Sequence, residues 1–310
     1  MTNNSGRPAF PTGQLPALAV TAAPLLLPLL SPGMIWLQSL IPMVVAYQMV
    51  ALGYHQGRTV VIWAMLAAAM VALISGGLLI LFFGLSMVPL GYILARGIAL
   101  GEAPNWAGAK GLVYLLCFWL LLGAFSGITG SPGPVRVIQE SLDHTVTTVM
   151  EEEEAAAAAL ANLRRVFDRT WPALFTISLL SLVWLNLMAS HWLLRRRNPA
   201  LSPWPEFKHW RLPDHFVLAA ALGLLLWLSR LEPIASVGLN LVLIMGMLYF
   251  MQGLGVMSFL LAHWRLPPLL RGICYALVLL QVYGPVLLAI LGLADVHLDW
   301  RRRLTNNNAA

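Results

Sequence analysis

Long apolar runs, separated by short polar breaks or by glycine and proline, dominate the chain. The runs cover residues 15–30, 34–53, 59–74, 78–95, 111–127, 171–194, 215–231, 234–262 and 266–293. Most approach the roughly 20 residues that a helix needs to cross a bilayer. The last run contains Gly284 and Pro285, so it either crosses once or breaks there and doubles back. The pattern predicts an all-α, polytopic helical membrane protein with eight or nine transmembrane helices.

Composition supports this class. Hydrophobic residues make up 59% of the 310 positions and charged residues only 10%, whereas soluble domains have about 45–50% and about 25%. We expect an N-terminal cytoplasmic tail (1–14), a single helical membrane domain (15–300) and a C-terminal tail (301–310). The net charge of +6 is spread over loops beside apolar runs. It therefore indicates contact with membrane lipids, and nucleic acid is not expected as a partner.

One long hydrophilic segment interrupts the apolar runs. From Val135 to Phe167, apolar residues recur every three or four positions, which is typical of an amphipathic helix. We therefore predict an extracytoplasmic amphipathic helical insertion over residues 131–169. The acidic run 151–154 lies within it, but four adjacent carboxylates on a helix point in different directions. We expect a solvated surface there, and no metal site.

The segment 195–213, RRRNPALSPWPEFKHWRLP, is predicted to be a basic cytoplasmic loop. Loops rich in Lys and Arg stay on the cytoplasmic side, and most of the 19 Lys and Arg residues fall on loops that this orientation places there, Arg58 and Arg96 among them. The N-terminus is then cytoplasmic, whereas the side of the C-terminus stays open. The topology anchors are Arg195, Arg196, Arg197, Lys208 and Arg211.

Polar groups inside the predicted spans are mostly uncharged. None of the 13 acidic residues is predicted at mid-span, and Asp295 falls near a span end. Candidate ligand-binding residues are Asn186, Asn240, Tyr249 and Gln252, for which hydrogen bonds between helices are the alternative. Gly246 and Gly253, seven residues apart on one helix face, are candidate partner-packing residues. No nucleophile motif, phosphate loop or metal-ligand spacing occurs, so we expect no cofactor and no enzyme activity.

Several motifs in the second half carry a family likeness. They are WPALFTISLL, HWLLRRRNPAL, WPEFKHWRLP, NLVLIMGMLYFMQGLGVMSFLLAHWRLP and LLAILGLADVHLDWRRR. Together they resemble the YybS-like, or DUF2232, family of bacterial membrane proteins, which is distantly similar to the S components of energy-coupling-factor transporters. This resemblance implies a multi-pass protein of the bacterial inner membrane. It also implies that Ala19 and Ala23 match the Ala-x-x-x-Ala motif with which S components pack on a transmembrane coupling subunit.

Three functions are consistent with these features. The first is a non-enzymatic, small-molecule-binding transporter component, of unknown substrate, that is energised by a coupling subunit and ATPases. The alternative is a membrane scaffold or assembly factor that docks other proteins through its outer helix and cytoplasmic loop. The third is an enzyme acting on a lipid-linked substrate through groups at span ends, such as His191, Glu232, Asp295 or Asp299.

Overall fold

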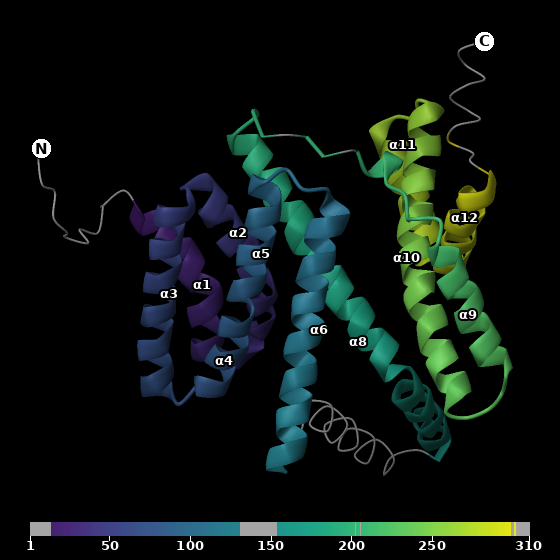
Figure 1. Ribbon diagram of the computed structural model, residues 1–310, viewed down its shortest axis with the longest axis horizontal. Helices are drawn as coiled ribbons and strands as arrows, with labels where there is room; N and C mark the ends of the chain where they lie inside the picture. Colours follow the sequence, from purple (N-terminus) through teal and green to yellow (C-terminus); the bar gives the residue numbers. More distant parts are fainter. Residues whose placement is uncertain (1–13, 131–153, 202, 205, 299–300, 302–310) are drawn as a thin grey trace, which may run out of the picture. The chain divides into compact units, whose positions relative to one another are not determined.

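The computed structural model describes residues 14–130, 154–201, 203–204, 206–298 and 301 (Figure 1). Among these residues every regular element is a helix. The chain divides into two compact units, the first made of residues 1–129 and 179–204 and the second of residues 130–178 and 205–310. Helix α8, Glu154–Arg197, contributes residues to both units.

The first unit is built from short and long helices that follow one another closely. They are α1 (Leu15–Leu30), η2 (Pro32–Leu40), α2 (Ile41–Ala51), α3 (Tyr54–Ser75), α4 (Leu78–Ser86), α5 (Val88–Ala99) and α6 (Pro104–Thr129). Proline lies in the first turn of α2 and α5, where its missing N–H costs nothing. Helix α3 ends at Gly76, whose φ of +71° is the left-handed cap that favours glycine.

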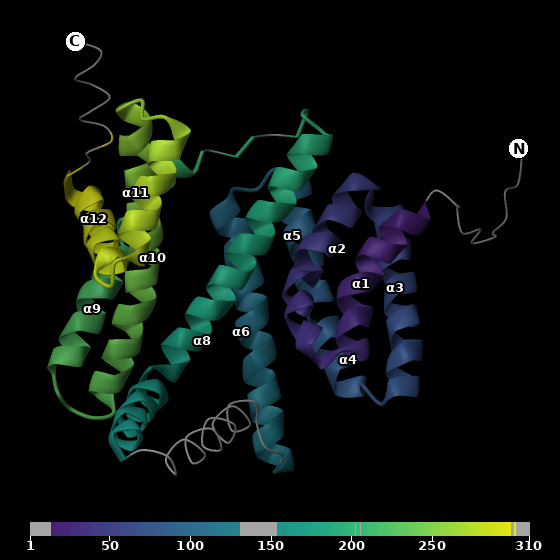
Figure 2. The same cartoon turned by 180° about the vertical axis from the view of Figure 1, so that it is seen from behind.

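Helix α2 packs against both α3 and α5 (Figures 1 and 2). Glycine allows both contacts. A Cβ at Gly57 of α3 would lie 2.7 Å from the backbone oxygen of Gln48, and one at Gly91 of α5 would lie 2.6 Å from the Cβ of Val45. Small residues at such points let helices in membranes approach closely. The result is a tight three-helix cluster with α2 in contact with its two neighbours.

The second unit is organised around α10 (Ile234–His263), which has 30 residues. Its other described elements are the N-terminal part of α8, η3 (Phe207–His209), α9 (Phe216–Leu228), α11 (Pro268–Leu280) and α12 (Gly284–Leu298). Helices α9 and α12 and the η3 turn all pack on α10 (Figure 1). The α10–α12 contact is made backbone to backbone, because a Cβ at Gly253 would lie 1.9 Å from the carbonyl oxygen of Leu288.

Six described helices are long and apolar enough to cross a membrane, or up to seven if the bent pair α11–α12 counts as one span. The predicted eight or nine spans are therefore not confirmed. The difference arises because α1 and α9 have only 16 and 13 residues, about 24 and 20 Å, which is shorter than a core of about 30 Å. Helices α11 and α12 meet at 107°, so the run 266–293 is broken, and α12 begins at Gly284.

Two predicted segments look different in the structure. The apolar runs 78–95 and 111–127 leave residues 96–110 between them as a predicted loop, whereas only residues 100–103 separate α5 from α6. Most of the predicted 131–169 insertion, residues 131–153, lies outside the described residues. From Glu154 onward α8 continues for 44 residues, through Pro172 and into the predicted span 171–194. Residues 154–169 are thus one helix with that span.

Candidate functional site

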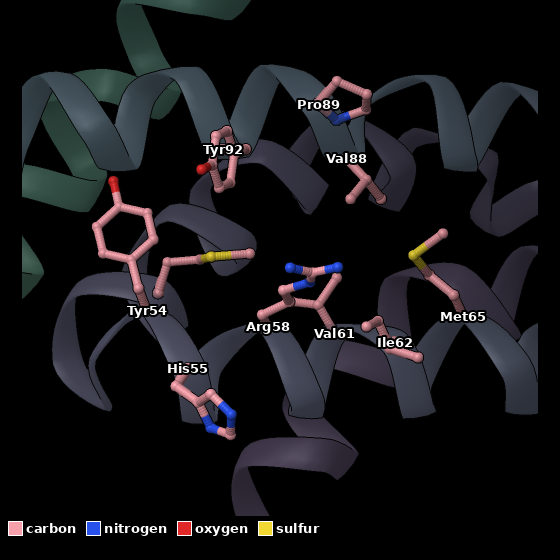
Figure 3. Close-up of a pocket in the computed structure, with 10 residues that line it drawn as sticks. Tyr54, His55, Arg58, Val61, Ile62, Met65, Val88, Pro89 and Tyr92 are labelled. Carbon is pink, nitrogen blue, oxygen red and sulfur yellow. The ribbon is translucent and has the colours of Figure 1, made fainter.

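A groove in the first unit is the candidate binding site (Figure 3). Its volume is about 590 Å³, within the range of about 300–1,000 Å³ that is usual for small-molecule sites. Helices α3 and α5 form its walls, and α2 contributes Met49. The lining residues are Met49, Tyr54, His55, Arg58, Val61, Ile62, Met65, Val88, Pro89 and Tyr92.

One end of the groove is polar. The guanidinium of Arg58 extends from α3 into the space between α3 and α5, whereas His55 points away from α5 (Figure 3). At the same end the rings of Tyr54 and Tyr92 meet edge to face, with centroids 5.7 Å apart. No described residue forms an ion pair with Arg58. Because arginine stays protonated in proteins, this end carries a fixed positive charge.

The rest of the groove is apolar. Val61 and Met65 continue along α3, and Val88 faces them from α5 (Figure 3). The side chain of Ile62 is 42% exposed, so the groove opens along the outer face of the helices. Methionine is flexible and polarisable and can adapt to the shape of a ligand. The site therefore combines one cation, which has no ion-pair partner among the described residues, with walls that offer few hydrogen-bonding groups.

Asn186, a predicted ligand-binding residue, binds backbone groups of a neighbouring helix in the first unit. Its Oδ1 accepts a hydrogen bond from the N–H of Met43 (2.9 Å), and its Nδ2 donates to the carbonyl oxygens of Ser39 (2.9 Å) and Leu182 (2.8 Å). Ser39 and Met43 are four residues apart and flank Pro42, so the amide replaces an interrupted helical hydrogen bond. Both amide donors are used within the protein.

Asn240 repeats this arrangement in the second unit. Its Oδ1 accepts a hydrogen bond from the N–H of Ala173 (2.8 Å), and its Nδ2 donates to the carbonyl oxygens of Arg169 (2.9 Å) and Ser236 (2.8 Å). Arg169 and Ala173 are again four apart and flank a proline, Pro172. The structure therefore places both asparagines between helices, where their amides stabilise proline-containing turns.

Gln252 and Tyr249 lie in the core of the second unit, and Gln252 contacts a buried carboxylate there. Gln252 is fully buried, accepts a hydrogen bond from the N–H of Leu212 (3.2 Å) and donates to Oδ2 of Asp295 (3.5 Å). Asp295 is 2% exposed and pairs with Arg301 at 3.1 Å. Tyr249 packs in the same core, where its hydroxyl has no partner among the described residues.

Asp295 lies near the end of its helix, as the sequence predicted, and it is buried there. Asp295 lies inside α12, and Gln252 and Arg301 surround its carboxylate. Arg301 also donates to the carbonyl oxygens of Lys208 (2.8 Å) and Trp210 (2.9 Å). The position near the end of an apolar run did not exclude burial, because the 207–212 segment folds over that end.

The predicted packing residues have different environments. Gly253 is in backbone contact with α12, within the second unit, whereas nothing lies within 4 Å of a Cβ at Gly246. On α1, Ala19 is exposed and Ala23 is half-buried. The buried face of α1 is formed by other residues, so the Ala19 face is open in the first unit.

The predicted anchor residues also lie in two places. Arg195, Arg196 and Arg197 form the last turn of α8, where cations favourably face the helix dipole. Arg196 lies over the ring of Trp192 at 3.8 Å, and Arg197 donates to the hydroxyl of Tyr47 at 3.3 Å.

The remaining two anchors belong to the second unit. Lys208 forms an ion pair with Glu206, and its hydrogen bond and charge lower the pKa of the Glu206 carboxyl. Arg211 donates to the carbonyl oxygens of Asp295 (3.3 Å) and Val296 (3.4 Å). The two hydrogen bonds of Arg211 bring the basic segment onto α12.

Sequence reasoning did not identify the groove, because residues 54–58 were assigned to a loop. Helix α3 instead begins at Tyr54, which places Arg58 one turn further along the same face. A signal was present, since positions 54, 58, 61 and 65 have the three- and four-residue spacing of a helix face. In the described part of the chain, no group of three or more His, Cys, Asp or Glu side chains is placed to hold a metal ion.

Long apolar helices, with buried polar side chains that form hydrogen bonds between them, are typical of a multi-pass helical membrane protein. A family model described as "Predicted membrane protein (DUF2232)" matches residues 19–296. The chain therefore belongs to the DUF2232 family. Comparison with curated proteins gives no match, and neither does comparison with solved structures.

Proposed function

We propose that this DUF2232 protein is a non-enzymatic membrane component that holds a small molecule in the groove between α3 and α5. The observation that carries the proposal is the groove itself, about 590 Å³ in volume, into which Arg58 extends without an ion-pair partner among the described residues. In this proposal the protein is the binding subunit of an importer that partner proteins energise. The likeness of its YybS-like motifs to energy-coupling-factor S components supports a role in uptake.

The first helix supports the proposed contact with a transmembrane coupling subunit. Ala19 and Ala23 lie on α1 at the spacing of the S-component motif, and Ala19 is exposed. Small side chains on an open helix face allow another helix to approach closely. We place the protein in the bacterial inner membrane with a cytoplasmic N-terminus, as its basic loop indicates.

Mass spectrometry of the purified full chain tests this function. The protein would be extracted in mild detergent from cells that carry its natural partners, and bound molecules and proteins would be identified. Met65→Trp should fill the apolar end of the groove. Leu66→Trp is the matched control, because Leu66 is half exposed and lies outside the lining. We expect a retained small molecule with the wild type and with Leu66→Trp, and its loss with Met65→Trp.

The same experiment can overturn the proposal. If neither a small molecule nor a coupling subunit or ATPase is retained, the importer function is wrong. A protein partner that is captured equally by all three forms, with no small molecule in any, would indicate the scaffold alternative.

A further inference from the structure

We infer that the ligand of the α3–α5 groove is a single-chain amphiphile, with an anionic carboxylate at the Arg58 end and an unbranched apolar tail along α3. This inference rests on the proposed function, since it names the ligand class of the same groove. It is carried by three features: the charge at one end, the length of the apolar part and the side on which the groove opens.

The charge selects an anion. Arg58 is the one cationic side chain that points into the groove, and none of the lining residues is acidic. Arg58 is exposed in the first unit, and its planar fork matches the two oxygens of a carboxylate. The rings of Tyr54 and Tyr92 lie on the side of Arg58 away from Met65, with their hydroxyl oxygens turned away from the guanidinium (Figure 3).

The apolar part selects a chain. From Arg58 to Met65 the groove follows α3 for seven residues, or about 10 Å along the helix axis. Val61, Ile62 and Val88 line this length with side chains that offer no hydrogen bonds. A polar tail would lose its water there without compensation. The volume of the groove suits one chain of drug-like size.

The open side faces the place where lipids would lie. Helix α3 is a candidate membrane span, and so is the Leu78–Ala99 segment that includes α5. Ile62 and Tyr92 on the two walls are each 42% exposed. An amphiphile dissolved in the bilayer can therefore enter the groove from the side, with its charged group held near one end of the span.

Binding of radiolabelled dodecanoate to the full chain tests the ligand class. The protein would be placed in nanodiscs of zwitterionic lipid, and binding to empty nanodiscs would be subtracted. The variants are Arg58→Gln and Met65→Trp, with Arg195→Gln and Leu66→Trp as matched controls. Arg195 is an exposed residue of the same unit outside the groove. Competing probes are dodecanol, dodecyltrimethylammonium and butyrate.

We expect dodecanoate to saturate at one site per chain. Loss of the charge in Arg58→Gln should weaken binding about tenfold or more, and Met65→Trp should abolish it, while both controls bind as the wild type does. Dodecanol and dodecyltrimethylammonium should compete at least tenfold more weakly. Butyrate should compete more than a hundredfold more weakly, because its chain buries fewer methylenes.

Two outcomes would overturn the ligand class: equal competition by dodecanol and dodecanoate, or unchanged dodecanoate binding in Arg58→Gln. If Arg58→Gln does not fold, Arg58→Lys and the comparison of probes on the wild type decide instead. Failure here leaves the importer proposal standing if a different molecule co-purifies and is lost in Met65→Trp. Conversely, Arg58-dependent dodecanoate binding without any coupling partner keeps the ligand class and removes the importer.

Discussion

Asp295 and Arg301 form a buried ion pair in the second unit. Their side chains are 2% and 12% exposed, and Arg301 also holds two carbonyl oxygens of the 207–210 segment. Removing one partner of a buried ion pair leaves an uncompensated charge. The pair therefore fastens the end of α12 to the segment that precedes α9.

Asp295→Ala should lower the free energy of unfolding by about 3–5 kcal/mol. The double variant Asp295→Leu with Arg301→Met should cost less than Asp295→Ala alone, because it leaves no unpaired charge. Equilibrium unfolding in mixed micelles measures both values. Asp168→Ala is the control, since the exposed pair of Asp168 and Arg164 should contribute about 0.5 kcal/mol or less. Equal losses for Asp168→Ala and Asp295→Ala would contradict the role of burial.

The two asparagine braces use the same chemistry in different units. Each amide accepts from the N–H of the residue after a proline and donates to the carbonyl four residues earlier. An unsatisfied backbone group is costly in the apolar interior of a membrane protein. Asn186 and Asn240 thus bridge backbone groups on the two sides of a proline, which leaves no free amide donor for a ligand.

Asn240→Ala should destabilise the protein by about 1–2 kcal/mol, since hydrogen bonds between membrane helices contribute up to about 1.7 kcal/mol. Adding Pro172→Ala should recover part of this loss, because the helix can then straighten and close its own hydrogen bonds. Asn162→Ala, on the exposed side of α8, should have little effect. If Pro172→Ala does not recover any of the stability lost in Asn240→Ala, the proposed coupling between Asn240 and Pro172 is contradicted. Thermal unfolding followed by circular dichroism compares the four proteins.

These polar pairs were beyond sequence-based prediction because their partners are far apart in the chain. Asn186 binds Met43 across 143 residues, and Gln252 binds Asp295 across 43. The sequence identified the polar residues inside the spans, but hydropathy carries no information on which helices face one another. Whether such a residue contacts a ligand or forms a hydrogen bond between helices can be decided only from the way the helices pack.

At the scale of helices, the close contact of α10 with α12 depends on Gly253 of α10. A Cβ at Gly253 would meet the backbone of Leu288, which cannot rotate away, whereas a Cβ at Gly246 would meet nothing within 4 Å. Gly253→Ala should therefore separate α10 from α12 and cost about 1–3 kcal/mol. Gly246→Ala should be neutral or stabilising by about 0.5–1 kcal/mol, since alanine favours helix. Equal stability of the two variants would contradict the backbone contact.

The apolar runs predicted helix positions well where turn residues bound them. The run 15–30 coincides with α1, and the break at Gly284 coincides with the start of α12. Other breaks carried weak signals: α4 and α5 divide at Met87 within one continuous apolar run. The start of α3 at Tyr54 was also missed, and the groove with it. Polar residues in the first turn of a helix have the same hydropathy as loop residues, so a hydropathy pattern assigns them to a loop.

At the scale of the whole molecule, the basic loop is more than a connection at the membrane surface. Leu212 binds Gln252, which lies 11 residues before the end of α10, or about 16 Å along its axis. The second half of the loop therefore runs beside α10. This explains why α9 is short although it packs on a helix of 30 residues, because part of that length is covered by extended chain.

The orientation of the chain can be tested at two exposed turns, after Cys117 and Cys274 are replaced by alanine. Ala200→Cys reports on the basic loop, and Leu231→Cys reports on the turn between α9 and α10. An impermeant maleimide should label Leu231→Cys on intact cells and should label Ala200→Cys only after permeabilisation. Labelling of Ala200→Cys on intact cells would reverse the orientation. If both sites need permeabilisation, the 13-residue α9 does not cross, and the chain from Pro213 to Glu232 turns back within one side of the bilayer.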